Sequence, residues 1–350
     1  MAQVTVRVDS TTLTDFVRDL FVRAGLPEPD AGTVADVLVW ANLRGVASHG
    51  VLRIPNYLNR VASGVFNPHP EIRVDPEGAA FFIQDSDHAM GAVAMTQAMG
   101  LAIEKARDAG VCWGLVRHTT HMGAIGYYTL AAARAGMAGM VMASSTPNMA
   151  YHGARAAGVA TSPIAISVPG GEHAPLNFDM ATSVISIGAL AHARDSGEAL
   201  AEGLALDGAG NPTTNSANAV LPLPVGGAKG SGLALMFECL SGLMVGSPIL
   251  APMLEGPPAG DNHRQNAVVV AIDIAAFTDL AGYRANVDGL VAQIKALPKA
   301  AGVSEILVPG ERGDRLLAER QSYGIPIAGG TWRRLADAAS NLGVDMPPVL

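Results

Sequence analysis

Charge is scarce in this sequence, and its basic residues are not clustered. Charged residues make up 15% of the 350 residues, and the net charge is -8. The 23 basic residues are scattered through the chain without forming runs. A nucleic-acid backbone or an anionic membrane surface attracts proteins through clustered basic residues. We therefore expect neither nucleic acid nor a membrane as a partner.

Cysteine and long apolar runs are also few. Cys112 and Cys239 lie far apart in apolar surroundings, which predicts buried free thiols in a reducing compartment. The basic segment, apolar core and cleavage site of a signal peptide are missing from the opening residues. Residues 233–254 are strongly apolar, but Glu238 and Pro248 interrupt them before the roughly 20 residues that a membrane span needs. These absences predict a cytoplasmic protein.

The usual glycine-rich nucleotide fingerprints are missing as well. No G-x-G-x-x-G sequence follows any strand that we can place. The segment 226–232 is rich in glycine, but Gly230 follows Lys229 where a Walker A loop has Ser or Thr. A nucleotide, if one binds, must be held in another way.

Hydrophobic residues make up 49% of the chain, enough for a sizeable core, and their spacing changes near residue 70. Before that point, helical periodicity predicts three helices, and Asp30 is placed to cap the second. After it, strands alternate with helices, which predicts an α/β architecture. The expected helices are 13–21, 34–43, 51–62, a long one ending at 109, 124–135, 233–245, 287–297 and 331–342. The expected strands are 80–83, 111–116, 137–143, 164–168 and 268–272, and 194–217 is expected to be irregular.

The segment from Ser48 to Tyr57 gathers polar groups between two apolar helices. His49, Arg53 and Tyr57 are four residues apart, so they share one face if a helix begins near His49. Arg53 can grip a carboxylate with its planar fork, while the other two can hydrogen-bond a neighbouring oxygen. A partly exposed polar helix face with a histidine cap explains the same spacing equally well.

His121 follows the strand that ends at Val116, and α/β proteins bind ligands at the carboxyl ends of strands. A histidine there can exchange a proton with a ligand, because its pKa of about 6.5 lies near working pH. A loop histidine satisfied by backbone groups fits the position too. His118 and His121 have a metal-ligand spacing, but no third ligand is evident, so we expect no metal.

Four further segments have the composition of a ligand-binding wall. Ser145 offers a hydroxyl at a strand end, and Asp179 lies beside small residues, although turn chemistry and a helix cap explain these two as well. Lys229 stands among glycines that let backbone approach a phosphate, ahead of a helix expected from Leu233. Residues 309–312 follow a short apolar run and form either a nucleotide-contacting turn or a strand exit.

Together these segments resemble the malate/L-lactate dehydrogenase family of the non-Rossmann type, over nearly the whole chain. Its relatives include ureidoglycolate, sulfolactate and diketogulonate oxidoreductases and piperideine-2-carboxylate reductase. The most specific motifs are Arg44-Gly45 through Ser48-His49-Gly50 to Arg53 and Tyr57, His121 with Gly123 and Tyr127, Asp179 to Ser183, and Lys229-Gly230. The chain departs from the family pattern at Thr161-Ser162-Pro163, often Thr-Asn-Pro, and at Gly188-Ala189, often Gly-Lys.

The resemblance implies a family-specific, non-Rossmann NAD(P)-binding α/β fold with a mixed sheet and a smaller helical domain built from both termini. Residues 1–73, joined by the C-terminal helix at 320–350, would form the helical domain. Residues 74–319 would form the α/β domain that binds NAD or NADP and carries out catalysis. The resemblance also implies a small carboxylate as substrate and a homodimer with the site near the subunit interface.

The family's functional residues carry over to matching positions of this sequence. His121 would be the general acid/base, and Ser48, His49, Arg53 and Tyr57 would hold the substrate. The cofactor site would be lined by Ser145, Asp179, Met180, Ala181, Lys229, Gly310, Glu311 and Arg312.

These assignments lead to one reaction and two alternatives. The substrate carboxylate would bind Arg53, hydride would pass between nicotinamide and carbon 2, and His121 would protonate the oxygen or nitrogen on that carbon. One alternative is a reductase of a cyclic imine 2-carboxylate. The other is a non-catalytic nucleotide or small-molecule binder, against which the presence of both His121 and Arg53 argues.

Overall fold

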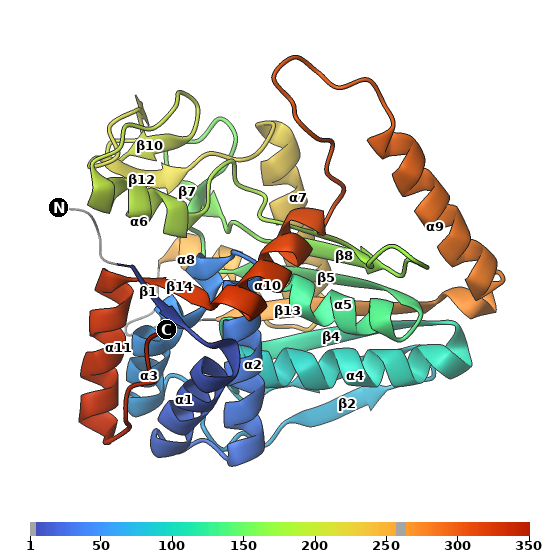
Figure 1. Ribbon diagram of the computed structural model, residues 1–350, viewed down its shortest axis with the longest axis horizontal. Coiled ribbons are helices and arrows are strands. Elements are labelled where there is room, and N and C mark those ends of the chain that lie inside the picture. Colours follow the sequence, from blue (N-terminus) through green and yellow to red (C-terminus); the bar gives the residue numbers. More distant parts are fainter. Residues whose placement is uncertain (1–4, 257–263) are drawn as a thin grey trace.

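A seven-stranded mixed sheet lies at the centre of the computed structural model, which describes residues 5–256 and 264–350 (Figure 1). The strand order is β2-β3-β4-β13-β5-β8-β9. Only β3 and β4 pair in parallel, and the other pairs are antiparallel. This confirms the predicted α/β class with a mixed sheet. The bounds are β2 Arg73–Glu77, β3 Phe81–Asp85, β4 Val111–Thr119, β5 Met137–Ser145, β8 Ile164–Val168, β9 Leu176–Met180 and β13 Gln265–Asp273.

Strand β13 determines which chain ends meet at the site. Its run of buried valines, Val268 to Val270, suits a strand covered on both faces. Because β13 is antiparallel to both β4 and β5, its first residue, Gln265, pairs with Thr119 and with Ser145. The carboxyl ends of β4 and β5 and the start of β13 therefore lie at one edge of the sheet.

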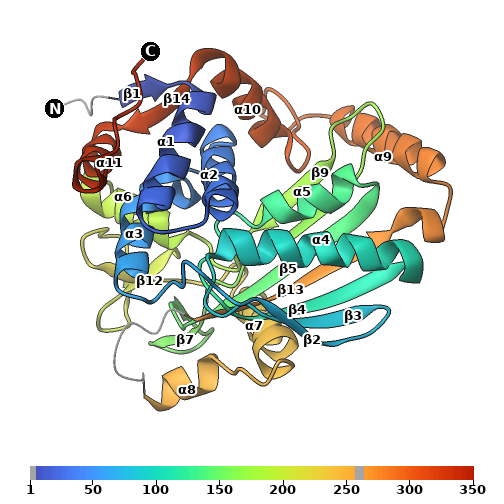
Figure 2. The same cartoon turned by 90° about the horizontal axis from the view of Figure 1, so that it is seen from below.

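Helices cover both faces of this sheet (Figure 2). On one face lie α4, Gly91–Ala109, and α5, Gly126–Arg134. Alanine and glycine positions in α4 let it pack closely on β4 and β13. On the other face, Phe237 of α7, Ala228–Glu238, packs with Val245 against β13. The helix continues into a π-helical turn, η3, over Cys239–Leu243.

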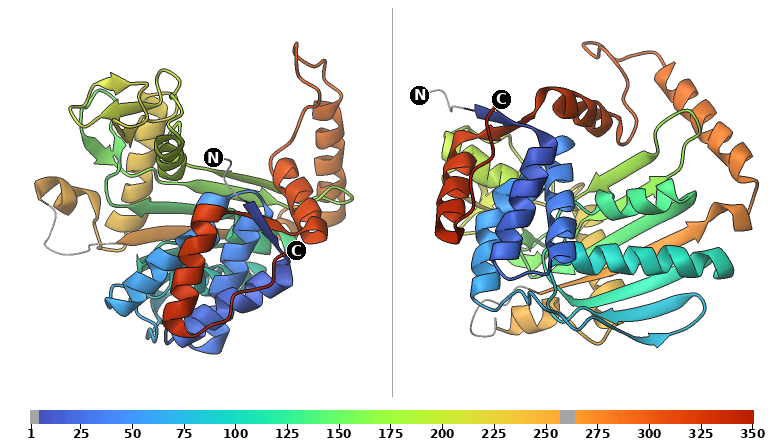
Figure 3. Two further views of the ribbon diagram at one scale, coloured as in Figure 1. Left: turned by 60° about the vertical axis from the view of Figure 1, so that its left-hand side comes forward. Right: turned by 60° about the horizontal axis from the view of Figure 1, so that its bottom comes forward.

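Both ends of the chain contribute to the helical unit beside the sheet (Figure 3). Strand β1, Thr5–Val8, pairs with β14, Ile325–Ala328, and α11, Gly329–Leu342, contacts α1 and α3. The prediction that the last helix packs on the first unit is confirmed. The helices are α1 Ser10–Arg23, α2 Glu28–Leu43 and α3 Ile54–Ala62. Two 3-10 turns, η1 Ala47–His49 and η2 Val51–Arg53, lie between α2 and α3.

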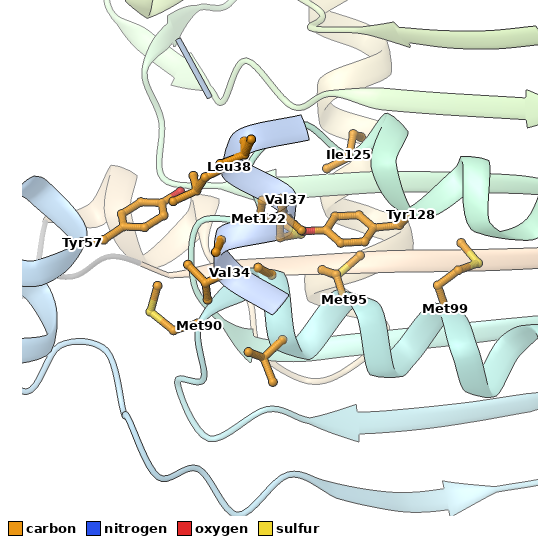
Figure 4. Packing of buried hydrophobic residues seen from close by; sticks show 14 of the residues in the cluster. Val34, Val37, Leu38, Tyr57, Met90, Met95, Met99, Met122, Ile125 and Tyr128 are labelled. Atoms are coloured by element: carbon orange, nitrogen blue, oxygen red, sulfur yellow. Dashed lines mark hydrogen bonds between the residues drawn. The ribbon is translucent and has the colours of Figure 1, made fainter. Parts of the chain in front are cut away.

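The helical unit and the sheet share one hydrophobic cluster. Helix α2 is buried on almost every side, because it lies between α1 and the α4 and α5 layer. Figure 4 shows its residues Val34, Val37 and Leu38 packed among methionines and Tyr128 of the α/β part. The division at residue 73 stays a prediction, since this core is continuous across it.

Several predicted boundaries were wrong. Pro27, not Asp30, is the N-cap of α2, and Asp30 lies in the first helical turn. Residues 194–217, expected to be irregular, hold the end of α6, Ile187–Ser196, and two of the three strands of a small sheet. Strands β10, Ala205–Asp207, and β11, Pro212–Thr213, are too short for a clear pattern. Cys239 is only half-buried, because it lies where α7 passes into η3, whereas Cys112 is buried as predicted.

The other elements surround the sheet or connect its strands. None of the described helices is long and apolar enough to cross a membrane. Helix α10 was not predicted, because no apolar stripe marks it and none of its residues is buried. The bounds are β6 Met149–Ala150, β7 Ala157–Val159, α6 Ile187–Ser196, β10 Ala205–Asp207, β11 Pro212–Thr213, β12 Ala219–Pro222, α8 Leu250–Glu255, η4 Ile274–Ala276, α9 Leu280–Lys295 and α10 Glu311–Tyr323.

Truncating Leu38 tests whether α2 is a core element of the whole fold. Leu38 is 1% exposed, so Leu38→Ala should lower the free energy of unfolding by about 2–5 kcal/mol through lost burial and a cavity. Leu52→Ala is the matched control, because Leu52 is 38% exposed. Denaturant unfolding measures both. Equal losses in the two variants would contradict the central place of α2.

Candidate active site

Segments that are far apart in the sequence meet at a cavity of about 470 Å³ at the sheet edge described above. It lies between the 3-10 turns after α2, the loop before α5, and the ends of β5 and β9. The structure thus brings both halves of the predicted site together. The predicted residues that line the cavity are Ser48, His49, Arg53, His121, Ser145, Asp179, Met180 and Ala181.

The segment from His49 to Tyr57 is not one continuous helix, so the prediction of a single shared face was wrong. His49 ends η1, Arg53 ends η2, and Tyr57 lies in α3. The chain breaks at Gly50, where Oδ1 of Asn42 accepts a hydrogen bond from the N–H of Val51 at 2.7 Å. A Cβ at residue 50 would lie 1.8 Å from that oxygen. Glycine is therefore required for this close approach.

His121 is held from behind by protein groups. The Gly123 N–H donates to Nδ1 of His121 at 3.2 Å, and the Tyr57 hydroxyl lies 2.5 Å from the same nitrogen. Tyr57 is buried, and burial raises the pKa of its hydroxyl well above the usual value. Tyr57 therefore contacts His121 as a neutral phenol and does not line the cavity as a substrate-holding group.

His49 stacks on His121 with ring centroids 5.5 Å apart. Its Nδ1 lies 3.0 Å from the Ser48 hydroxyl. Burial, and then the positive charge of Arg53, lower the pKa of His49 to about 4. His49 is thus neutral at physiological pH and is suited to hydrogen bonding, not to donating a proton.

Arg53 and Asp179 supply opposite charges to the cavity. The Nε of Arg53 donates to the backbone oxygen of Ser48 at 2.6 Å, which fixes one edge of the guanidinium. Asp179 lies at the end of β9, and its Oδ2 accepts a hydrogen bond of 2.8 Å from the N–H of Gly126 at the start of α5. The surrounding walls desolvate the Asp179 carboxylate and raise its pKa to about 6, although the residue is open to the cavity. Asp179 both caps a helix and opens onto the cavity.

Lys229 lies beside the cavity and does not line it. Helix α7 begins at Ala228 and not near Leu233, so Lys229 falls in its first turn. Gly230 in this helix packs closely on the segment that follows β9. A Cβ at residue 230 would lie 2.5 Å from the backbone oxygen of Thr182. Lys229 is exposed and has no ion-pair partner in the part of the chain that the structure describes.

Residues 310–312 are not brought to the cavity. The backbone oxygen of Gly310 accepts a hydrogen bond from Nη2 of Arg44 at 2.9 Å. The Glu311 carboxylate pairs with Lys295 and Arg315, each at 2.5 Å. Arg312 is exposed at the start of α10. Their predicted contacts with a cofactor stay predictions.

His118 and His121 point to different partners. His118 adopts a left-handed backbone with φ of 51°, and its Nδ1 lies 3.1 Å from both carboxylate oxygens of Asp85. His121 faces Tyr57. Across residues 5–256 and 264–350, no group of three His, Cys, Asp or Glu side chains is arranged to hold a metal ion.

Sequence reasoning missed three groups of lining residues. Gln265 reaches the cavity because β13 is antiparallel, and no local pattern gives strand direction. Asn148 lines the cavity just after the predicted Ser145 segment, and its Oδ1 accepts from the N–H of Thr161 at 2.8 Å. Residues 186–188 also line it, and the Gly188-Ala189 departure was the only signal that pointed to them.

Comparisons with known proteins agree with this geometry. A family model described as malate/L-lactate dehydrogenase matches residues 8–336. The malate dehydrogenase of Pyrococcus horikoshii is 37% identical, over 97% of this chain and 96% of that protein. Ureidoglycolate dehydrogenase (NAD(+)) of Escherichia coli O157:H7 is 32% identical, over 96% and 97%. The solved delta1-piperideine-2-carboxylate reductase of Pseudomonas syringae superposes with a TM-score of 0.83 at 30% identity, covering 95% and 99%.

The chain therefore belongs to a class of α/β enzymes that have a mixed sheet and lack the glycine fingerprint. In this class a histidine and an arginine line one cavity. The chain is a member of the malate/L-lactate dehydrogenase family. It is an oxidoreductase of the dehydrogenase type.

Replacing Gly50 tests the backbone arrangement that presents His49 and Arg53. Gly50→Ala should displace Asn42 and break its hydrogen bond to Val51, lowering the free energy of unfolding by about 1–3 kcal/mol. Gly32→Ala in α2 is the control: no atom lies within 4 Å of its Cβ, and alanine should add about 0.5–1 kcal/mol of helix stability. Thermal or denaturant unfolding decides. A Gly50→Ala protein as stable as the Gly32→Ala protein would rule this arrangement out.

Proposed function

We propose that this enzyme is an NAD(P)-dependent oxidoreductase that moves a hydride to or from carbon 2 of a small 2-hydroxy or 2-oxo carboxylate. The observation that carries the proposal is the joint presence of Arg53 and His121 on one cavity. A planar guanidinium matches a carboxylate, and an imidazole can exchange a proton with the oxygen on the neighbouring carbon. The family membership supports the same chemistry.

His121 acts as the general acid/base through Nε2 in this proposal. Nδ1 is engaged by Gly123 and Tyr57, so the protein fixes the orientation of the ring. For Nε2 to gain and lose the exchanged proton, Nδ1 must keep its own proton, which the Tyr57 oxygen accepts. The tautomer in which Nδ1 accepts from the Gly123 N–H carries its proton on Nε2 and cannot act as a base there. Tyr57 is a positioning residue here, a change from its predicted role of holding substrate.

The substrate carboxylate binds Arg53, with Ser48 and His49 beside it. The hydrogen bond from Nε to Ser48 aims the guanidinium, so its Nη groups provide the carboxylate contact. The neutral ring of His49 hydrogen-bonds the hydroxyl or carbonyl oxygen of the substrate through one of its nitrogens. Its stacking on His121 keeps these two groups of the substrate site next to the acid/base.

Two features of the start of α7 support a dinucleotide site beside the cavity. Lys229 in the first turn of α7 places a cation at the positive end of a helix, which is unfavourable unless an anion such as a phosphate binds there. Gly226 and Gly227 both have left-handed backbones, which favour close approach to phosphate. Residues that would hold the cofactor are Ser145, Asp179, Met180, Ala181 and Lys229. The nicotinamide, when bound, accepts or supplies the hydride at carbon 2.

NAD and NADP both remain candidates. The E. coli relative carries NAD(+) in its name, which supports NAD. Lys229 is an exposed cation in the first turn of α7 and can serve a phosphate of either cofactor.

A second candidate function is reduction of a cyclic imine 2-carboxylate. It is favoured by the likeness to the Pseudomonas reductase, whose name states that activity. Arg53 would hold the carboxylate in the same way, and His121 would donate its proton to the ring nitrogen. The two functions differ only in the atom that receives the proton.

We also propose that the enzyme works as a homodimer in the cytoplasm. Apolar side chains on α7, η3 and α8 are about half exposed, namely Met236, Leu243, Met244 and Leu254. Large apolar side chains left exposed on such elements are typical of subunit interfaces. The buried free thiol of Cys112 supports a reducing compartment.

An absorbance assay at 340 nm tests the proposed function. NADH and NADPH are offered with a panel of 2-oxo acids and cyclic imine carboxylates. Oxidation of one nucleotide with a 2-oxo acid is the expected result. Oxidation with cyclic imines alone would favour the second candidate, and tight nucleotide binding without any oxidation would favour a non-catalytic binder.

Removing the imidazole of His121 tests the acid/base role. His121→Ala should lower kcat by about 10²–10⁴-fold. Tyr57→Phe keeps the ring but removes the hydroxyl bonded to Nδ1, so it should lower kcat by roughly tenfold and shift the pH profile. His69→Ala is the control, since His69 is exposed and away from the cavity. Near wild-type turnover of His121→Ala at saturating substrate would remove His121 from this role.

A further inference from the structure

The charges around the cavity are few and opposed. Among its described lining residues, Arg53 is the only permanent cation and Asp179 the only carboxylate. His49 adds no charge near neutral pH, because its pKa lies at about 4. When Asp179 is ionised, the wall as a whole carries no net charge.

Arg53 offers a place for one carboxylate. Its Nε is already bonded to the backbone oxygen of Ser48, so the guanidinium presents its Nη edge in a fixed direction. A bidentate contact with one carboxylate uses both Nη groups. A second anionic group on the same small substrate would need another cation.

Two apolar side chains line the cavity on the segments that flank Ser48, whose backbone oxygen holds Arg53. Val46 precedes η1 and Ile187 opens α6, and both line the cavity with 38% and 40% of their surface exposed. Close packing brings the two segments together: a Cβ at Gly188 would lie 2.8 Å from Cβ of Ser48. Exposed apolar side chains facing a polar anchor are typical of a pocket that takes an apolar substituent.

We propose that the enzyme selects 2-hydroxy and 2-oxo acids with a single carboxylate and an uncharged, apolar group on carbon 3, and discriminates against dicarboxylates. This inference rests on the proposed function and names its substrate class. The carboxylate binds Arg53, and the apolar group lies toward Val46 and Ile187. A second carboxylate would enter the apolar wall and share the cavity with Asp179, a like charge.

The inference sets this chain apart from the Pyrococcus relative, which is named for malate, a dicarboxylate. Identity of 37% leaves ample room for a change in the few residues that line a substrate pocket. The relevant positions here are Val46 and Ile187, which line the cavity and carry no charge.

A pair of four-carbon 2-oxo acids tests the inference. 2-Oxobutyrate and oxaloacetate have the same chain length and differ in the terminal group, methyl or carboxylate. We expect kcat/KM for 2-oxobutyrate to be at least about tenfold higher, a modest figure for avoiding a like-charge contact. Equal values, or a preference for oxaloacetate, would overturn the inference.

A charge introduced at residue 187 provides the matched test. Ile187→Lys should raise kcat/KM for oxaloacetate and lower it for 2-oxobutyrate, whereas Ile187→Met, similar in length but uncharged, should leave the ratio nearly unchanged. If the ratio of kcat/KM for oxaloacetate to kcat/KM for 2-oxobutyrate is the same in the Lys and Met variants, residue 187 does not face the carbon-3 group. That result would contradict the inference.

A binding measurement separates this inference from the proposed reaction. Thermal shifts of the cofactor-loaded enzyme are compared for 2-hydroxybutyrate and malate, with no turnover needed. A larger rise in Tm with 2-hydroxybutyrate supports the charge preference even if no substrate is turned over. Absence of turnover would refute only the proposed reaction. A larger rise with malate would overturn the preference.

Discussion

The hydrogen bond between Tyr57 and Nδ1 of His121 is the contact on which the site depends. Tyr57 lies in the helical unit and His121 in the loop after β4, so 64 residues of sequence separate the two ends of a 2.5 Å contact. The continuous core around α2 holds both ends in place. Because the bond orients His121 from behind, the ring is set before any ligand enters the cavity, as catalysis by a positioned acid/base requires.

Electrostatics give each polar residue of the cavity a distinct part. Burial and the neighbouring Arg53 keep His49 neutral, while burial keeps the Tyr57 hydroxyl protonated. Asp179, whose pKa is raised to about 6, is the only carboxylate among the described residues that line the cavity. Titratable groups whose environments push their pKa values apart are typical of active sites. In the proposed mechanism, the arrangement separates carboxylate binding at Arg53 from proton exchange at His121.

Local patterns predicted what depends on local sequence. Apolar periodicity located the helices of the first unit and strands such as β8, and strand ends pointed to His121 and Ser145. Two features escaped because they depend on tertiary packing. The close approach of Gly50 to Asn42 breaks a helix that spacing alone favoured, and antiparallel β13 delivers Gln265 to the cavity. Tyr57 was expected to hold the substrate, whereas its hydroxyl contacts Nδ1 of His121, because spacing does not show which side chains point inward.

The most direct test of the account is a crystal structure of the enzyme with a reduced nicotinamide cofactor and oxamate, an unreactive mimic of a 2-oxo acid. The account predicts the oxamate carboxylate on the Nη groups of Arg53 and its amide oxygen within hydrogen-bond distance of Nε2 of His121, with Nδ1 still bonded to Tyr57. Oxamate bound away from Arg53, or a His121 ring turned so that Nδ1 faces the ligand, would contradict it.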